Sequence, residues 1–361
     1  MLFITRGLKQ VFSIILLLGA SSASSNNNDA QFSGSTASTA PITGVIRYYY
    51  IAAEDTTWDF APSGQSLVHC MDHQPAPCAI PEPYGHIFSA VRYVEYTDET
   101  FTKPKPQLKW LGVLGPIIRA EVGDTVKVHF CNHTMTGSAY SMHPHGLRYT
   151  KDNEGAFYYG VNSSSPPGAG AEVHPGQCFD YTWLADKVSG PARGDPSSKV
   201  WWYHSHVDSA NDINSGLLGP IIITRKGMAN ADGSPKDVDR EFVTAFFIFN
   251  RLSDAEAGLM HSINGYIFGN LKGLVAKRGE RVRWHVLGMG NENDLHTPHW
   301  HGKTVLVGAP PARRRTDVLE LLPASMVTAD MNADNIGEWQ YHCHVADHMN
   351  AGMVTTYQIL P

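Results

Sequence analysis

Histidines with a spacing suited to metal binding are concentrated in four short windows of the chain. Ten of the 18 histidines fall in these windows: His143, His145, His204, His206, His296, His299, His301, His342, His344 and His348. Each window holds a His-x-His pair, and residues i and i+2 of a strand point to the same face. Four such pairs present eight imidazoles, which is enough to hold several metal ions.

The last window also carries softer ligands. Cys343 is followed by His348 and then by Met353, each after four intervening residues, and His296 lies upstream. Two nitrogens, one thiolate and one thioether are the ligand set typical of a blue-copper electron-transfer site, in which methionine is the weak axial ligand. A zinc site would need a closed tetrahedral set and would leave Met353 without a role. The sequence therefore predicts one blue-copper site in the C-terminal half.

Short strand-like runs bounded by Gly, Pro and Asn separate these ligands. No long segment has the 3.6-residue period of a helix, so the pattern predicts an all-β fold built of β-sandwiches. The expected strands cover residues 45–52, 125–131, 199–203, 220–225, 241–250, 281–287, 316–322, 338–341 and 353–360.

The two halves of the chain repeat one another. Residues 119–126 match 275–282 in pattern, and 203–207 match 341–345. An internal repeat of this size indicates a duplicated domain. Alignment on the repeat gives the first-domain counterparts of His296, Cys343, His348 and Met353, in that order: Tyr140, Ser205, Ala210 and Ser215. None of these is a blue-copper ligand, so we expect no such site in the first domain, although its His-x-His pairs are present.

The chain divides into five expected parts. Residues 1–23 carry positive charge, then a short apolar run and small residues, which is the pattern of a cleaved export signal; an uncleaved anchor is the alternative. The polar residues 24–43 predict a disordered lead-in. The two β-domains are expected over 44–226 and 240–361, joined by a polar linker at 227–239. We therefore expect a secreted protein, extracellular or periplasmic.

The five cysteines fit an oxidising compartment, with four available for disulfides and one left over. Cys70 and Cys78 could close a small loop, and Cys131 and Cys178 could join two strands of the first domain. The sequence leaves the pairing open. Cys343 is the odd cysteine, which agrees with its place in the copper ligand set.

The composition excludes several classes of protein. Hydrophobic residues are 42% and charged residues 17%, and 28 basic residues against 34 acidic ones give a net charge of −6. Without a basic excess, nucleic acid is not an expected partner. A collagen, a coiled coil and a polytopic membrane protein are also excluded. Residues 54–107 carry no motif that we can interpret, and a structural insertion is preferred there over a substrate-side loop.

The order of the metal motifs is similar to that of the multicopper oxidases. His-x-x-His-x-His at residues 296–301 and His-Cys-His-x₃-His-x₄-Met at 342–353 carry the resemblance, which extends over residues 44–361. It implies tandem cupredoxin-type Greek-key β-sandwich domains. It also implies an oxidoreductase that couples one-electron oxidation of a reductant to four-electron reduction of O₂ to water, with four copper ions: one type 1, one type 2 and two type 3.

The resemblance implies a ligand set for each copper. The type 1 ligands would be His296, Cys343, His348 and Met353. The type 2 ligands would be His143 and His299. The type 3 ligands would be His145, His204, His206, His301, His342 and His344. Since Cys343 lies between two type 3 ligands, one stretch of backbone would connect the single-electron site to the site that reduces O₂.

Reduction of O₂ to water also consumes protons. Asp152 and Glu154, which follow His-Pro-His-Gly, are candidate donors. A solvated loop is the competing interpretation of these two acids.

Segments outside the copper motifs resemble the ceruloplasmin and hephaestin group. They cover residues 110–121, 262–266 and 288–292. This resemblance implies that the reductant is Fe(II). Carboxylates are hard ligands that favour Fe(III) over Fe(II), which assists loss of an electron. The implied iron ligands are Glu256, His261, Glu292 and Asp347.

Other functions stay open at the level of sequence. A laccase-like oxidase of phenols would need an apolar pocket over His296 or His348, and no Met-rich segment supports a Cu(I) oxidase. Nitrite reductase is a different reaction on what looks like a related two-domain scaffold. That family resembles one with the blue site in the first domain, which differs from the arrangement predicted here. The non-enzymatic alternative is a copper-binding scaffold, since the coagulation cofactors resemble ceruloplasmin with eroded copper sites.

The division of ligands between the domains predicts an assembly. Half of the cluster ligands lie in each domain. Relatives with six cupredoxin domains close a ring in which the first and last domains share the cluster. Two domains per chain would give the same ring as a homotrimer, with each cluster between the first domain of one subunit and the second domain of the next.

Overall fold

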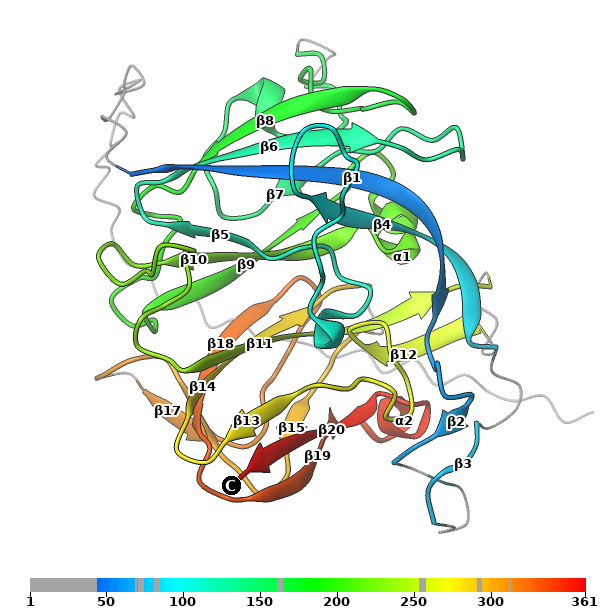
Figure 1. Cartoon of the computed structure of the whole chain (residues 1–361), viewed down its shortest axis with the longest axis vertical. Helices are drawn as coiled ribbons and strands as arrows, with labels where there is room; N and C mark the ends of the chain where they lie inside the picture. The colour runs from blue at the N-terminus through cyan, green and yellow to red at the C-terminus, as the bar shows by residue number, and fades with distance from the viewer. Residues whose placement is uncertain are drawn as a thin grey trace, which may run out of the picture. The chain divides into compact units, whose positions relative to one another are not determined.

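Strands dominate the computed structural model, which describes residues 44–68, 70, 75–80, 85–160, 165–252, 258–290, 294–311 and 313–361. Within these residues the strands form four large sheets, paired as two β-sandwiches, and one two-stranded sheet (Figure 1). The expected export signal and lead-in, residues 1–43, lie outside the described part of the chain.

The first sandwich packs sheet β4-β1-β6-β8 against sheet β5-β10-β9-β7. Its strands are β1 (Ile46–Asp59), β4 (Ile87–Tyr96), β5 (Ile118–Glu121), β6 (Thr125–Asn132), β7 (His143–Pro144), β8 (Cys178–Leu184), β9 (Ser198–His204) and β10 (Leu218–Thr224). Its helical segments are η2 (Lys109–Leu111), η3 (Lys151–Asn153) and α1 (Ser209–Ser215). The two-stranded sheet pairs β2 (Gln65–Ser66) with β3 (Cys78–Ala79).

The second sandwich packs sheet β12-β11-β14-β18-β16-β17 against sheet β13-β20-β19-β15. Its strands are β11 (Arg240–Asn250), β12 (Leu259–Ile263), β13 (Val275–Lys277), β14 (Arg281–Gly288), β15 (Pro298–Trp300), β16 (Val305–Val307), β17 (Arg314–Thr316), β18 (Met326–Asn332), β19 (Gly337–Cys343) and β20 (Val354–Leu360). Helix α2 (Ala346–Asn350) connects β19 to β20.

The two sandwiches share one topology. The order β4-β1-β6-β8 in the first matches β12-β11-β14-β18 in the second. β1 runs parallel to β6 as β11 does to β14, and β5 runs parallel to β10 as β13 does to β20. The prediction of an all-β fold is therefore confirmed, and the halves that repeat in sequence also repeat in strand order.

Alternation of apolar and polar residues explains how each strand faces its sandwich. In β6, Val126, Val128 and Phe130 point into the core and are fully buried, whereas Lys127 and His129 lie on the outer face. Successive side chains of a strand point to opposite faces, so this alternation places one row against the facing sheet. The two outer residues stay available for contacts with solvent or with neighbouring loops.

Apolar packing continues from one sandwich into the other. Trp202 of β9 is fully buried, and its indole N–H donates to the Gly288 carbonyl at 3.2 Å. The Trp110 ring lies 5.6 Å from the Phe242 ring in an edge-to-face arrangement. These contacts belong to one core that includes residues of both sandwiches. The relative placement of the two sandwiches therefore rests on buried aromatic surface.

The long strand β1 reaches from the first sandwich toward the second (Figure 1). Near its end, the Trp58 indole N–H donates to the Gly265 carbonyl at 2.7 Å, and just beyond it the Phe60 ring packs 5.4 Å from Phe249. Residues 54–107 thus contain the end of β1 and all of β4, so much of this segment belongs to the first sandwich itself rather than to an insertion.

One expected strand is not formed. Residues 317–322 make only isolated bridges, from Val318 to His299 and from Leu321 to His296, and β17 ends before them. Leu319 and Leu321 are buried, so the alternation of the sequence reflects a buried face. The backbone of this segment contacts the histidine segment at single points instead of along a continuous ladder.

The cysteines pair as the sequence suggested. Disulfides join Cys70 to Cys78 and Cys131 to Cys178, and Cys343 is a buried free thiol. In the described part of the chain, none of the helices has the length and apolar character needed to cross a membrane.

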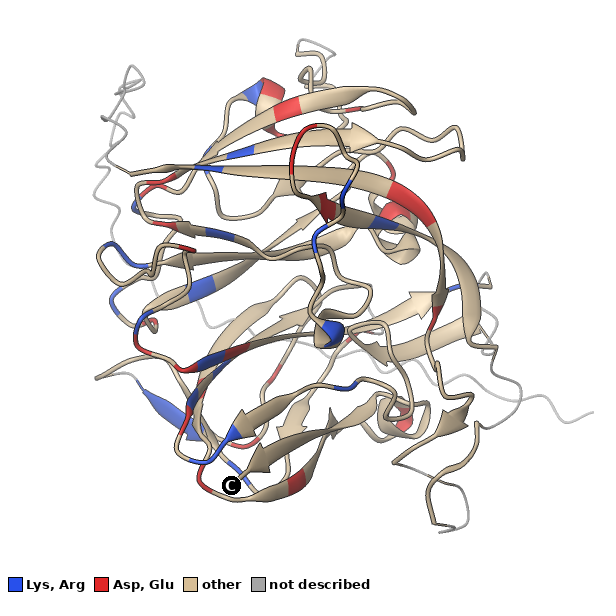
Figure 2. Cartoon of the chain, in the orientation of Figure 1, with Lys and Arg blue, Asp and Glu red and all other residues tan. Residues whose placement is uncertain are grey.

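Charged residues of both signs are interspersed over the two sandwiches (Figure 2). A buried ion pair lies at the contact between the two sandwiches. Arg283 is 0% exposed and forms an ion pair with Asp330 at 2.7 Å. The same guanidinium donates to the hydroxyls of Ser197 and Ser198, on the first sandwich, at 2.6 and 2.9 Å. Arg283 thus satisfies its donors on both sides of the interface between the sandwiches.

We expect Arg283→Met to lower the free energy of unfolding by about 3 kcal/mol, because it leaves the buried Asp330 carboxylate with the more exposed Arg281 as partner. Arg314→Met is the matched control, since it removes an exposed ion pair with Glu320 and should change stability by less than about 1 kcal/mol. Urea unfolding of the two variants measures the difference. Equal midpoints would contradict the role given to Arg283.

Candidate metal centres

The end of β19 places the soft ligands of the second sandwich. β19 ends at Cys343, α2 carries His348, and Met353 directly precedes β20. The Cys343 N–H donates to the Met353 carbonyl at 3.0 Å, and the Met353 N–H donates to the His348 carbonyl at 2.9 Å, which closes the loop. His296 comes from the segment before β15, whose Pro298 pairs with Cys343. The structure thus brings together the four residues predicted for type 1 copper.

Three donor atoms of this group converge in a buried position. Nδ1 of His296 lies 3.2 Å from Nδ1 of His348, and Sγ of Cys343 lies 3.9 and 3.7 Å from these two atoms. His296, Cys343 and Met353 are fully buried, and His348 is nearly so. Two imidazole nitrogens and a sulfur turned toward one another in apolar surroundings suit a soft cation.

The surroundings of Cys343 favour its thiolate. Burial by itself raises the pKa of the thiol, but contacts with His296 and His348 and backbone hydrogen bonds outweigh it and lower the pKa to about 6. One of these bonds comes from the Thr297 N–H, 3.3 Å from Sγ. The thiolate is the form that binds metal, so the loop presents Cys343 ready for coordination at neutral pH.

Asp294 is a further residue of this site that sequence reasoning missed. It is buried, and its carboxylate lies 3.2 Å from Nε2 of His296 and accepts the Ile248 N–H at 2.8 Å. Burial lowers the pKa of His296, but Asp294 and Cys343 outweigh it and raise that pKa. A carboxylate behind a ligating imidazole fixes its orientation. The available signal was the i, i+2 spacing of Asp294 and His296.

The first sandwich contains a matching loop with different side chains. The Ser205 N–H donates to the Leu217 carbonyl at 3.1 Å, and the Leu217 N–H donates to the Asp212 carbonyl at 3.1 Å, which repeats the backbone pattern of the copper loop. The Ser141 N–H points at Oγ of Ser205 at 3.1 Å, in the place of the bond to the cysteine sulfur. Ser205, Asp212 and Leu217 therefore occupy the positions of the cysteine, histidine and methionine.

This match corrects part of the alignment made from sequence. Tyr140 exchanges backbone bonds with Val173 as His296 does with its partner, so the counterparts Tyr140 and Ser205 were right. The counterparts Ala210 and Ser215 were wrong, and Asp212 and Leu217 take their places. The physical reason is a longer helix, since α1 has seven residues and α2 has five.

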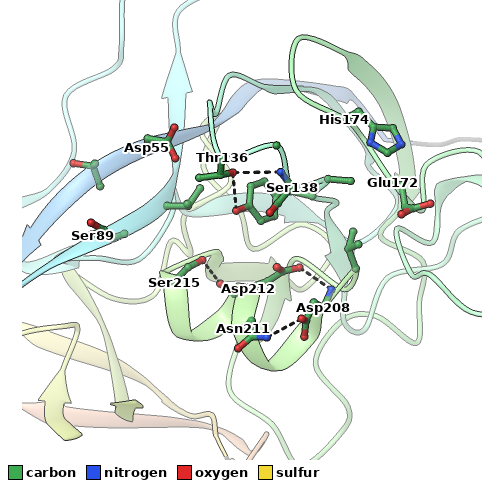
Figure 3. Close-up of a pocket in the computed structure, with 17 residues that line it drawn as sticks. Asp55, Ser89, Thr136, Ser138, Glu172, His174, Asp208, Asn211, Asp212 and Ser215 are labelled. Carbon is green, nitrogen blue, oxygen red and sulfur yellow. Dashed lines mark hydrogen bonds between the residues drawn. The ribbon is translucent and has the colours of Figure 1, made fainter. Parts of the chain in front are cut away.

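A cavity of about 830 Å³ opens beside this loop of the first sandwich (Figure 3). Asp208 and Asp212 line it from the side of α1, and Glu172 and His174 line it from a facing loop. The Ser205 hydroxyl donates to Asp212 at 2.6 Å, and burial raises the pKa of this carboxyl. Oxygen donors replace the sulfur and nitrogen of the second sandwich, so these residues do not suit blue copper.

The four histidines of the first sandwich form one group at the strand ends. β7 and β9 pair His143 with His204, and the rings of His143 and His206 and of His145 and His204 lie 5.1 and 5.2 Å apart. Nδ1 of His143 donates to the Glu154 carbonyl at 2.7 Å, which leaves Nε2 as its free nitrogen. Burial lowers the pKa of His145 to about 4 and that of His204 to about 3, so both are neutral, as metal ligands must be.

The second sandwich repeats this arrangement. β15 and β19 pair His299 with His342, and the His299 ring lies 4.8 Å from His301 and 5.4 Å from His344. Nε2 of His301 and Nε2 of His342 lie 3.0 Å apart. Nδ1 of His299 donates to the Asp317 carbonyl at 2.9 Å, which again directs Nε2 toward the group.

The two groups stay separate within the chain. Among the described residues, the cluster imidazoles contact one another only inside a group, never between groups. Most of them are at least partly accessible, and two of the second group are exposed: His301 and His344. Each sandwich thus presents its own group of imidazoles near its surface.

The two candidate proton donors lie on η3 and directly after it. Glu154 contacts the first histidine group through its carbonyl, and its carboxylate accepts the Tyr158 hydroxyl at 3.0 Å. Asp152 accepts the Ala169 N–H at 3.1 Å and supports the loop. The contact of Glu154 with His143 is thus made by the backbone, and no hydrogen bond from either carboxylate to a cluster histidine is found among the described residues.

Two of the four candidate iron ligands are described by the structure. The His261 ring in β12 lies 5.1 Å from His348, is buried, and its Nδ1 has no hydrogen-bond partner in the described part of the protein. Burial, together with His348, lowers its pKa to about 4. Asp347 is exposed on α2 beside His348. Glu256 and Glu292 lie outside the described residues.

Family models and known proteins match most of the chain. Two models, each described as multicopper oxidase, match residues 111–227 and 243–361. Human "Ferroxidase HEPHL1" is 35% identical over 346 residues, which cover 87% of this chain and 29% of that protein. Rat hephaestin is 34% identical over 88% of this chain and 30% of its own length, and human ceruloplasmin 35% over 87% and 31%. The chain thus spans about three-tenths of these relatives.

Solved structures share the fold. A multicopper oxidase crystal structure superposes with a TM-score of 0.60 at 20% identity, covering 87% of this chain and 89% of that one. The blue copper oxidase from Nitrosomonas europaea gives 0.57 at 20% identity, over 87% and 86% of the two chains. The predicted class of tandem cupredoxin-type β-sandwiches is confirmed.

Proposed function

Because this chain belongs to the multicopper oxidase family, as its copper motifs predicted, we propose that it oxidises Fe(II) to Fe(III) and passes the electrons to O₂. Copper supplies one-electron transfer and the reduction of O₂ to water at its sites. The type 1 ligands are His296, Cys343, His348 and Met353. The type 2 ligands are His143 and His299. The type 3 ligands are His145, His204, His206, His301, His342 and His344.

The alternation of β19 supports the connection between the two kinds of site. His342 and Cys343 are adjacent on the strand, and His344 follows directly, so the sulfur points to one side and the two imidazoles to the other. With copper bound, Cys343 would provide a path of a few covalent bonds to the cluster ligands His342 and His344. We propose Asp152 and Glu154, on the loop whose Glu154 backbone carbonyl accepts the hydrogen bond from His143, as the proton donors.

The observation that carries the choice of Fe(II) is the unpartnered nitrogen of His261. The polar atoms of a buried imidazole normally have hydrogen-bond partners. Nδ1 of His261 has no such partner among the described residues. The His261 ring lies 5.1 Å from the ring of His348, a proposed type 1 ligand, and Asp347 precedes His348 on α2. A cation bound by His261, Asp347, Glu256 and Glu292 would give Nδ1 of His261 a partner. It would also lie close to His348, a ligand of the proposed type 1 copper, which accepts the electron.

We expect His261→Ala and Asp347→Asn each to lower Fe(II) oxidation by about 10–100-fold while phenol oxidation changes by less than about twofold. Removing an iron ligand weakens only the reaction that uses iron. O₂ uptake with Fe(II) and with a simple phenol measures both activities, and the blue absorption reports whether type 1 copper is retained. If phenol is the better substrate and neither substitution changes the rate of Fe(II) oxidation, the protein is a laccase-like oxidase instead.

We also propose that the active form is a homotrimer and that it is secreted. Two half-sets of imidazoles, each accessible at its own sandwich, support a cluster completed by a second copy of the chain. Two disulfides support passage through an oxidising compartment.

A further inference from the structure

A separate group of ligand-type side chains lies on the outer face of the first sandwich. β6 and β8 are antiparallel, and their register sets His129 opposite Asp180 and Cys131 opposite Cys178. Residues two apart on a strand share a face, so the four side chains form one patch. None of them takes part in the copper sites proposed above.

His129 connects the carboxylate to the disulfide. Its Nδ1 lies 2.6 Å from Oδ1 of Asp180, and its Nε2 lies 3.7 Å from Sγ of Cys131. The carboxylate accepts a hydrogen bond from the Nδ1–H, which leaves the unprotonated Nε2 facing the sulfur. One ligand atom each of His129, Cys131 and Cys178 lies within 4.8 Å of the others. The Phe101 ring packs 5.6 Å from the imidazole and limits its movement.

We propose that His129, Cys131 and Cys178 form a redox-gated binding site for Cu(I). While the disulfide is intact, the sulfurs are not available as thiolates, which are the form that binds metal. After reduction, two thiolates and one imidazole nitrogen offer the soft donor set that Cu(I) prefers. Asp180 holds the imidazole from behind, in the carboxylate–histidine–metal arrangement that orients metal ligands.

A dithiol opens the site in two exchange steps. One of its thiolates attacks Sγ of Cys178, which is exposed, and the bond to Cys131 breaks. Cys131 leaves as a thiolate beside Nε2 of His129. The second thiolate of the dithiol attacks the mixed disulfide and releases Cys178, and the reductant becomes a cyclic disulfide. Two electrons pass from the dithiol to the protein, and its two protons go to the solvent when Cu(I) binds both thiolates.

The order of attack follows from burial. Cys131 is 2% exposed, whereas Cys178 is exposed. An incoming thiolate therefore reaches Cys178, and the buried sulfur of Cys131 is the leaving group. The geometry places the only contacting histidine of the described residues at the sulfur that must leave.

The test uses the copper-loaded full chain under argon, in a Cys70→Ser/Cys78→Ser parent that lacks the other disulfide. The protein is treated with dithiothreitol, desalted, exposed to the acetonitrile complex of Cu(I), and desalted again in the presence of bathocuproine disulfonate. Thiols and copper are then counted per chain. Compared with unreduced protein, we expect two more thiols before copper addition and about one more copper ion after it. Circular dichroism before and after reduction shows whether the sandwich stays folded.

Matched variants separate this site from non-specific thiol binding. His129→Ala keeps the disulfide, and after reduction it should lose the extra copper to the chelator; Asp180→Asn should hold it about 10–100-fold more weakly. Adding Cys131→Ser/Cys178→Ser to the Cys70→Ser/Cys78→Ser parent should leave a protein that gains neither thiols nor copper on reduction. The proposal is overturned if the reduced parent and the variant that also lacks Cys131 and Cys178 take up equal copper, if His129→Ala retains the extra ion as tightly as the parent, or if reduction unfolds the chain.

Discussion

Cys343→Ser is expected to remove the blue absorption and to lower O₂ uptake more than about 100-fold, beyond the range typical of losing an outer partner of a metal ligand. Cys343 gives the buried site its thiolate, and the same residue joins it covalently to His342 and His344. Its loss therefore removes a ligand and the shortest path at once. Absorption spectroscopy and an oxygen electrode measure the two effects.

A graded control comes from the fourth ligand. Met353→Leu preserves the two imidazoles and the thiolate and replaces one buried apolar side chain by another. Since the axial ligand tunes the potential of such sites rather than creating them, this variant should stay blue and keep substantial activity. A Cys343→Ser protein that turns over O₂ at the rate of Met353→Leu would show that electrons enter the cluster by another route.

The second large effect that we expect is recovery of O₂ uptake when two inactive variants are mixed. His143→Ala/His204→Ala removes half of the ligands in the first sandwich, and His299→Ala/His342→Ala does so in the second. Each variant alone should be inactive. The two variant proteins are dissociated, mixed in equal amounts and reassembled. A subunit interface is then functional only if one variant contributes its intact first sandwich and the other its intact second sandwich. This combination occurs in about a quarter of randomly formed interfaces.

The outcome distinguishes shared from internal clusters. A cluster built within one chain gives no recovery on mixing, because neither variant carries a complete set. Light scattering checks that wild type and both variants have the mass of three chains. A fully active monomer, or a mixture that stays inactive although it forms trimers, would contradict the assembly that we propose.

Local patterns in the sequence were sufficient for the fold class and for which histidines share a face within each sandwich. The i, i+2 spacing of His299 and His301, or of His342 and His344, predicts a shared face because strand geometry has a period of two. Cys343 and Met353 could be placed on one loop because only nine residues separate them. The repeat of the chain likewise indicated two sandwiches of one topology. Each of these inferences depends on residues close in sequence or on a pattern that occurs twice.

Contacts between distant residues could not be found in that way. Asp212 and Leu217 are the true counterparts of His348 and Met353, which the longer helix α1 conceals from an alignment without gaps. The separation of the two histidine groups depends on how the sandwiches pack, through Trp202 and its neighbours, and no local pattern encodes it.

The same limit applies to two contacts between residues that are distant in the sequence. His261 lies beside His348 because β12 and α2 meet in space, and its unpartnered Nδ1 is visible only once its surroundings are known. His129 and Asp180 are 51 residues apart and meet through the register of β6 and β8. The sequence by itself determined which chemistry the chain carries, since residue type and short spacing set the available ligands. Only the tertiary structure decided which ligands meet, because strand register and packing bring together residues that are distant along the chain.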